Sequence, residues 1–180
     1  MRVFAELVDD FRSLAAYAWF VPGVVISALL AILLGGRLGR RIGAHRIVAT
    51  LLVFSVGTVL AATVTPSRDA LMGAPGISSG CDLSRIGPAA WQDYAQVDDT
   101  SLNVLLFVPL GVSIALLTRS RLRAGLVLGA ILLPVGVETL QLVVTPLGRA
   151  CQAADVSDNL TGLALGLGLG LAVAWILRRR

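Results

Sequence analysis

The stretch AGLVLGAILLPVGVETLQLVVT, residues 124–145, decides the fold, because its 22 residues carry a single charged side chain, Glu138. About 20 apolar residues are enough to carry a helix across roughly 30 Å of hydrocarbon. The stretch therefore predicts a transmembrane helix. Pro134 lies within it, which frees a backbone carbonyl and predicts a kink.

Four further apolar runs cover about residues 14–34, 47–64, 101–118 and 160–177. The whole chain of 180 residues is 56% hydrophobic and 14% charged, with a mean hydropathy of +0.84. Soluble domains carry about 25% charged residues, so a soluble fold is excluded. No alternating pattern of ten-residue segments predicts a barrel. We predict an all-α integral membrane protein, a bundle of about five transmembrane helices.

The charged side chains divide the connections between these runs into two sets. One set is purely basic and contains Arg37, Arg40, Arg41, Arg46, Arg119, Arg121, Arg123, Arg178, Arg179 and Arg180. The other holds nearly all the acids, namely Glu6, Asp9, Asp10, Asp69, Asp82, Asp93, Asp98, Asp99, Asp155 and Asp158. The positive-inside rule places the arginines in the cytoplasm. The N-terminus is then outside and the C-terminus cytoplasmic, in the cell membrane.

This arrangement also predicts the organisation of the chain. Residues 1–66 form two N-terminal transmembrane helices, residues 67–100 an extracytoplasmic loop, and residues 101–180 a core of three transmembrane helices. The start of the chain is mixed to acidic, so no removable signal peptide is expected. Arginines grouped between apolar runs, without interleaved aromatic residues, are typical of topology signals and not of nucleic-acid binding.

Two cysteines, Cys81 and Cys151, both fall in connections on the outer side. Disulfides persist in that oxidising environment, so the two form a candidate bridge between the long loop and the connection after the fourth run. Two unpaired thiols are the alternative, because a sequence does not give the distance between them.

Glycines recur every four residues at Gly162, Gly166 and Gly170, which places them on one helix face and predicts close helix packing. Gly125 and Gly129 predict the same, more weakly, for the fourth run. Residues 35–39, Gly-Gly-Arg-Leu-Gly, lack the context of a phosphate-binding loop and are assigned to a turn. His45 is expected at headgroup level, without a metal.

Glu138 is the one acid inside an apolar run, about 10 Å below the outer surface at 1.5 Å per residue. A carboxylate at such a depth costs roughly 2.5 kcal/mol or more, so it needs a cavity or a partner. Gln141 and Thr145 share its helix face. Arg149 is the nearest cation in sequence. Glu138 is thus either a functional group or one half of a structural pair with Arg149.

Other polar residues gather at the outer ends of the third and fifth runs: Asp98, Asp99, Asn103, Asp155, Asp158 and Asn159. Acids before a helix cap its free N–H groups, and an asparagine can hydrogen-bond a neighbouring helix. Those structural roles are one interpretation. The other is an outward-facing polar pocket shared with Glu138.

The pattern resembles the VanZ-like family of bacterial membrane proteins. The resemblance rests on Asn103 with Phe-Val-Pro-Leu-Gly at 107–111, on Glu138 and Gln141, on Arg149, and on Asp155, Asp158, Asn159 and Gly162. It covers about residues 95–177. It implies an envelope protein, since the family's namesake is linked to resistance to the lipoglycopeptide teicoplanin. The family has no established enzymatic mechanism, so these residues transfer as a candidate site only.

Three functions fit these residues. The first is an envelope factor that lowers susceptibility to lipoglycopeptides, or binds a lipid-linked precursor, through a pocket of Asp99, Asn103, Glu138, Gln141, Arg149, Asp155, Asp158 and Asn159. The second is a membrane-embedded enzyme on a lipid-linked envelope precursor, with Glu138 as acid or base. Its carboxylates could hold Mg²⁺ or Ca²⁺, although we assign no metal and no cofactor. A transporter is disfavoured by the lack of an internal repeat.

Overall fold

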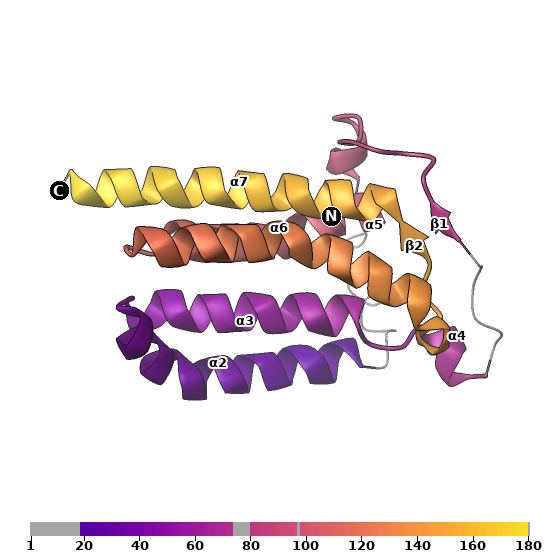
Figure 1. Ribbon diagram of the computed structural model, residues 1–180, viewed down its shortest axis with the longest axis horizontal. Coiled ribbons are helices and arrows are strands. Elements are labelled where there is room, and N and C mark those ends of the chain that lie inside the picture. Colours follow the sequence, from indigo (N-terminus) through magenta and orange to yellow (C-terminus); the bar gives the residue numbers. More distant parts are fainter. Residues whose placement is uncertain (1–18, 74–79, 97, 180) are drawn as a thin grey trace, which may run out of the picture.

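The computed structural model describes residues 19–73, 80–96 and 98–179. Five long helices run side by side in these segments: α2 (Phe20–Ile42), α3 (Arg46–Thr63), α5 (Asp99–Ala115), α6 (Ser120–Val143) and α7 (Ala153–Arg178) (Figure 1). The short elements are α4 (Arg68–Leu71), the 3-10 turns η1 (Asp93–Ala95) and η2 (Thr145–Leu147), and two parallel strands, β1 (Cys81–Asp82) and β2 (Cys151–Gln152). The predicted all-α bundle is confirmed.

Four of the helices, α2, α3, α6 and α7, are long and apolar enough to cross a membrane. They contain 18 to 26 residues, which corresponds to about 27 to 39 Å. Helix α5 is also apolar but has 17 residues, or about 25 Å, less than the roughly 30 Å hydrocarbon core. Large apolar side chains such as Leu33, Leu132 and Leu169 are exposed on the outside of the bundle, as lipid contact requires. The chain is a multi-pass membrane protein.

The first helix differs most from its prediction. Residues 14–18 of the predicted run lie outside the described residues, and α2 continues to Ile42. The predicted turn at residues 35–39 is therefore wrong, because this segment is helical. The glycines there serve packing, since a Cβ at Gly35 would collide with Thr50 of α3. The helix ends at Gly43, whose N–H bonds the carbonyl of Gly39 and whose φ of 68° lets the next N–H, that of Ala44, bond the same carbonyl.

Polar side chains fix the starts of two other helices. Asp98 accepts a hydrogen bond from the N–H of Ser101, and Ser101 Oγ in turn accepts from the N–H of Asp98, which is a capping box at the start of α5. The exposed His45 caps α3, because its Nδ1 accepts from the N–H of Ile47. Asp98 is thus a capping residue.

Helices α5 and α7 form the closest pair in the bundle. A Cβ at Gly162 would collide with the carbonyl oxygen of Val104, and one at Gly166 with that of Val108. Gly170 lies in the same way against Val112. The predicted packing role of this glycine series is confirmed, since only glycine lets the two backbones approach so closely.

The same prediction for the fourth run is wrong. Among the described residues, nothing lies within 4 Å of a Cβ added to Gly125 or Gly129. Both glycines are on the outer face of α6, where they contact no neighbouring helix. Pro134 lies within α6, which is one continuous helix from Ser120 to Val143.

Helix α5 occupies the centre of the bundle and contacts α3, α6 and α7. Its buried Phe107, Leu110 and Ile114 form a core cluster with Leu52 and Val59 of α3. Ala130 of α6 and Leu163 of α7 complete the cluster. The short third run therefore supplies most of the contacts among helices.

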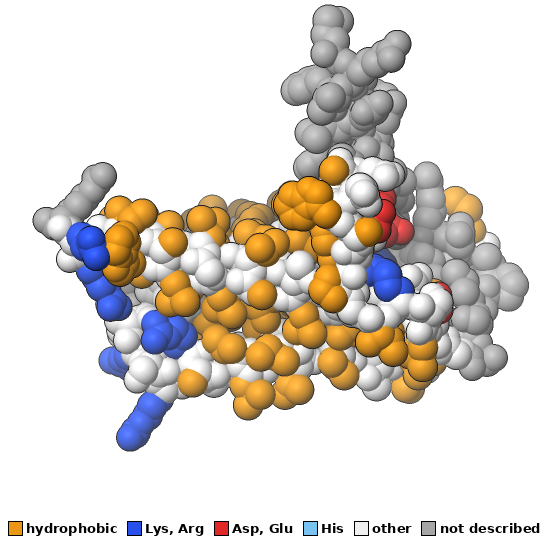
Figure 2. All heavy atoms as spheres, turned by 90° about the horizontal axis from the view of Figure 1, so that it is seen from above, with side chains coloured by type: hydrophobic (Ala, Val, Ile, Leu, Met, Phe, Trp, Pro, Cys, Tyr) orange, Lys and Arg blue, Asp and Glu red, His pale blue; other side chains and the backbone are white. Residues whose placement is uncertain are grey.

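The acidic side chains gather at one end of the bundle, and most of the arginines lie at the other end, although arginine is also present beside the acids (Figure 2). The arginine end contains the α2–α3 and α5–α6 connections and the C-terminus (Figure 1). The acidic end contains α4, β1, β2, η1 and the starts of α5 and α7. The separation is the one that the sequence predicts, while the orientation in the membrane stays a prediction.

A candidate polar site at the acidic end

The acidic end is closed by a covalent link between its two connections. Cys81 and Cys151 form a disulfide with a Cα–Cα distance of 4.6 Å. The same residues pair in register as the first positions of β1 and β2. The long loop is thereby fixed to the chain segment that enters α7.

An ion pair fixes the loop a second time. Arg85 Nη1 donates to Asp158 Oδ1 at 3.0 Å, and Nη2 donates to Oδ2 at 2.5 Å. Asp158 is 0% exposed, and the hydrogen bonds to it raise the pKa of Arg85 above its ordinary value. Beside this pair, the N–H of Gly87 donates to Ser157 Oγ at 3.0 Å. The loop around residue 85 is therefore held against the first turns of α7.

Sequence reasoning missed Arg85. The sequence predicts Asp158 as a helix cap or a pocket acid, and it offers Arg149 as the nearest cation to Glu138. The available signal was an arginine in a loop otherwise assigned to the acidic side. The pairing across 73 residues depends on the path of the loop, which hydropathy does not give.

Glu138 is 5% exposed, close to the C-terminal end of α6. Its Oε2 accepts a hydrogen bond from the N–H of Gln152 at 2.7 Å. Gln152 follows the disulfide-bonded Cys151 directly. The Glu138 carboxylate therefore holds the short strand β2 at the acidic end of the bundle.

Two further predicted site residues, Gln141 and Arg149, bond to the chain at the end of α3. Gln141 Nε2 donates to the carbonyl oxygen of Thr63 at 3.0 Å, and Gln141 is buried. Arg149 Nε donates to the carbonyl oxygen of Thr65 at 2.9 Å. The first bond satisfies a carbonyl that the last turn of α3 leaves without a helical partner, and the second holds the residue just beyond the C-cap Val64. Arg149 also lies within electrostatic range of Glu138.

Asp155 lies at the centre of this polar region. It sits in the first turn of α7, half-buried, and it makes no hydrogen bond or ion pair with the described residues. The charges that act on it are those of Asp99, Asp158, Arg85, Arg149 and Glu138. Of the predicted site residues, the structure thus brings together Asp99, Glu138, Arg149, Asp155 and Asp158.

The two asparagines complete the set. Asn159 is 2% exposed, and its Oδ1 has no hydrogen-bond partner among the described residues. Asn103 is half-buried in the first turns of α5.

Within the described segments, no group of three or more His, Cys, Asp or Glu side chains is arranged to hold a metal ion. Ser157 has no histidine nearby in sequence to activate it.

One further acid of this end is separate from the cluster. Asp82 is fully exposed and accepts from the N–H of Ser84 at 2.8 Å, which lowers its pKa below the ordinary value of 3.8. The cluster around Asp155 instead combines several carboxylates with the guanidinium groups of Arg85 and Arg149. Such a site can accept N–H donors on its acids and donate to an anion from its arginines.

Comparison with known proteins gives one match. The family model described as VanZ/LLP1 matches residues 77–177, which is more than half of the chain. The match includes the long loop from residue 77 together with α5, α6 and α7. No curated protein matches the chain significantly, and no solved structure does so.

Proposed function

Since the chain belongs to the VanZ/LLP1 family, we propose that it acts in the bacterial cell envelope and lowers susceptibility to lipoglycopeptide antibiotics of the teicoplanin type. It does so by binding at the acidic end, either to the antibiotic or to the lipid-linked precursor of the wall. The acidic end faces the outside of the cell membrane in this proposal, as the positive-inside rule predicts.

The observation that carries this proposal is the environment of Asp155. Its neighbours are already engaged: Glu138 holds Gln152, Asp158 holds Arg85, and Arg149 holds Thr65. Asp155 has no such contact among the described residues and is half-buried in the first turn of α7, and in this proposal its carboxylate binds the ligand. A group held ready by a rigid surrounding binds with little loss of conformational entropy.

The loop next to the cluster supports an amphiphilic ligand. Ile86 follows Arg85 and is 77% exposed, and Trp91 of the same loop is 85% exposed. Exposed apolar side chains beside a polar cluster suit a molecule with a polar head and a lipid tail. Both lipoglycopeptides and lipid-linked precursors have this chemistry.

Teicoplanin susceptibility tests the proposal. A sensitive host would express the wild-type chain, Asp155→Asn or Glu138→Gln, with matched levels of protein in the membrane. The control is Asp82→Asn, which removes an exposed acid at the same end. We expect the wild type and the control to protect, Asp155→Asn to lose protection, and Glu138→Gln to lose part of it, because a glutamine oxygen still accepts the N–H of Gln152.

Two outcomes contradict the proposal at different points. Failure of the wild-type chain to protect would reject the resistance function. Full protection by Asp155→Asn would reject the site while leaving the function.

Two acids at the same end of the bundle, the buried Glu138 and the half-buried Asp155, favour a second function. Two neighbouring carboxylates can divide acid and base roles, as in a membrane-embedded enzyme acting on a lipid-linked envelope precursor with Glu138 as acid or base. Membranes containing the chain would then convert a radiolabelled lipid-linked precursor, and Glu138→Gln would abolish the conversion entirely. Graded loss of binding without conversion supports the first function instead.

A further inference from the structure

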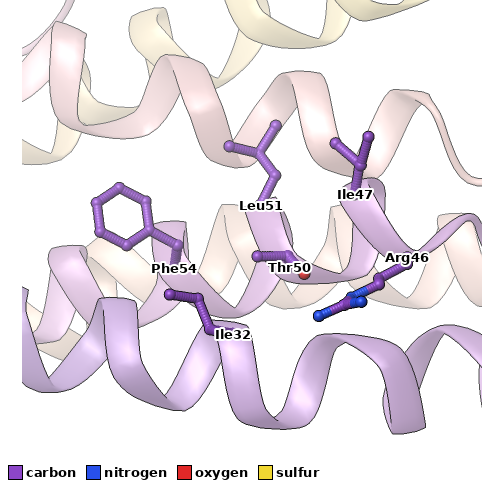
Figure 3. Close-up of a pocket in the computed structure, with 6 residues that line it drawn as sticks. All are labelled: Ile32, Arg46, Ile47, Thr50, Leu51 and Phe54. Carbon is purple, nitrogen blue, oxygen red and sulfur yellow. The ribbon is translucent and has the colours of Figure 1, made fainter.

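A groove runs between α2 and α3 at the arginine end, far along the bundle from the polar cluster (Figures 1 and 3). Its volume is about 400 Å³. It is lined by Ile32 of α2 and by Arg46, Ile47, Thr50, Leu51 and Phe54 of α3. Apart from Arg46 and Thr50 the lining is apolar, so the groove suits a hydrocarbon chain.

The groove opens toward the lipid and not toward the core. Ile32 is 58% exposed, and Ile47 is exposed still further. Next to it the two helices are in close contact at Gly35, where a Cβ would collide with Thr50. The floor of the groove is therefore fixed, and its open side lies where the membrane lipids are.

Two guanidinium groups border the surface over Gly36, and one of them, that of Arg46, also lines the groove. A Cβ placed on Gly36 would lie 3.8 Å from Arg46 Nε and 3.9 Å from Arg40 Nη1. In Figure 3 the side chain of Arg46 extends from α3 toward α2. The surface over Gly36 is thus a space between two cations, which repel each other unless an anion lies between them.

No acid of these two helices supplies that anion. The sequence contains no Asp or Glu between Asp10 and Asp69, a stretch that includes all of α2 and α3. The charges and the apolar groove together match one molecule, which has a phosphate head and an acyl chain.

We propose that the arginine end carries a binding site for an anionic glycerophospholipid. The phosphate lies over Gly36 between Arg40 and Arg46, and an acyl chain lies along the groove against Ile32, Leu51 and Phe54. The site is separate from the polar cluster and does not depend on the function proposed above.

Lipid binding by the purified full-length chain in detergent tests this proposal. Native mass spectrometry and thermal unfolding would be measured with phosphatidylglycerol, with phosphatidylcholine of the same acyl chains, and with inorganic phosphate. We expect phosphatidylglycerol to be retained and to raise the unfolding temperature, and the other two probes to do neither.

Two variants locate the site. Arg46→Gln removes one charge-assisted contact and should weaken phosphatidylglycerol binding about tenfold. It should not weaken α3, because a cation at a helix N-terminus is unfavourable. Gly36→Leu keeps every charge but fills the space between the guanidinium groups, and it should also lose the lipid.

Each variant has a matched control at the same end of the bundle. Arg121→Gln removes an exposed arginine from the start of α6, and Gly125→Leu adds a side chain where nothing lies within 4 Å among the described residues. Both should bind as the wild type does. Equal binding of the two lipids, equal loss in Arg46→Gln and Arg121→Gln, unchanged binding by a folded Gly36→Leu, or stabilisation by phosphate alone would each overturn the proposal.

Discussion

Arg85 and Asp158 are 73 residues apart in the chain and form an ion pair with two parallel hydrogen bonds. The pair is asymmetric, because the Asp158 side chain is 0% exposed and the Arg85 side chain is 32% exposed. An unpaired charge is far more costly on the buried side than on the exposed side. Removing the charge of Arg85 and removing that of Asp158 should therefore lower the free energy of unfolding by different amounts.

Arg85→Gln should lower the free energy of unfolding by about 3 kcal/mol, because it leaves the buried carboxylate of Asp158 without its cation. Asp158→Asn should cost only about 1 kcal/mol, because Arg85 can turn to water. Thermal unfolding in detergent gives both values. The double variant should resemble Asp158→Asn, and equal losses in the two single variants would contradict this account.

The disulfide closes a loop of 70 residues. Replacing both Cys81 and Cys151 by serine should lower the free energy of unfolding by up to about 4 kcal/mol, since the denatured chain regains the entropy of the open loop. A reductant should lower the unfolding temperature of the wild type toward that of the variant. The variant itself is the control, and it should not respond to the reductant.

The orientation can be tested with the same cysteines. After mild reduction of intact cells, a membrane-impermeant maleimide should label Cys81, the more exposed of the two cysteines, if the acidic end is outside. In a chain lacking both cysteines, Ser120→Cys places a thiol at the arginine end and should react only after permeabilisation. The reverse labelling pattern would show that the arginine end is outside and that the orientation is wrong.

The glycine series of α7 that packs against α5 gives a matched pair of variants. Gly166→Ala should lower the free energy of unfolding by about 1 to 3 kcal/mol, because the new Cβ collides with the carbonyl of Val108. Gly168→Ala, two residues away, meets nothing within 4 Å among the described residues and should stabilise α7 by up to about 1 kcal/mol. Thermal unfolding would separate them, and a neutral Gly166→Ala would mean that the backbones can move apart.

Much of the fold follows from hydropathy. The predicted run 47–64 differs from α3 by one residue at each end, because apolar character begins and ends sharply there. The extension of α2 through residues 35–39 could not be predicted, since a glycine-rich segment suggests a turn unless the neighbouring helix is known. Gly162 and Gly125 show the same dependence. The four-residue spacing predicted packing at both, more weakly at Gly125, and among the described residues only Gly162 has a helix against it.

The sequence predicts most residues of the candidate site, but it does not predict which atoms those residues contact. Glu138 and Gln141 stood out because polar side chains inside an apolar run need partners. The partners are the N–H of Gln152 and the carbonyl of Thr63, and backbone atoms leave no trace in the sequence. The role of Arg85 could not be predicted, because an arginine in a long loop can reach many different partners until the disulfide fixes the path of the loop.

The position of α5 has a consequence for how the chain is made. This helix of 17 residues is the shortest of the five, and its close partner, α7, is the last to leave the ribosome. Until α7 is synthesised, the surface of α5 at Val104, Val108 and Val112 has no glycine face against it. A nascent chain that stops before Gly162 therefore leaves this surface of α5 without the helix that packs against it.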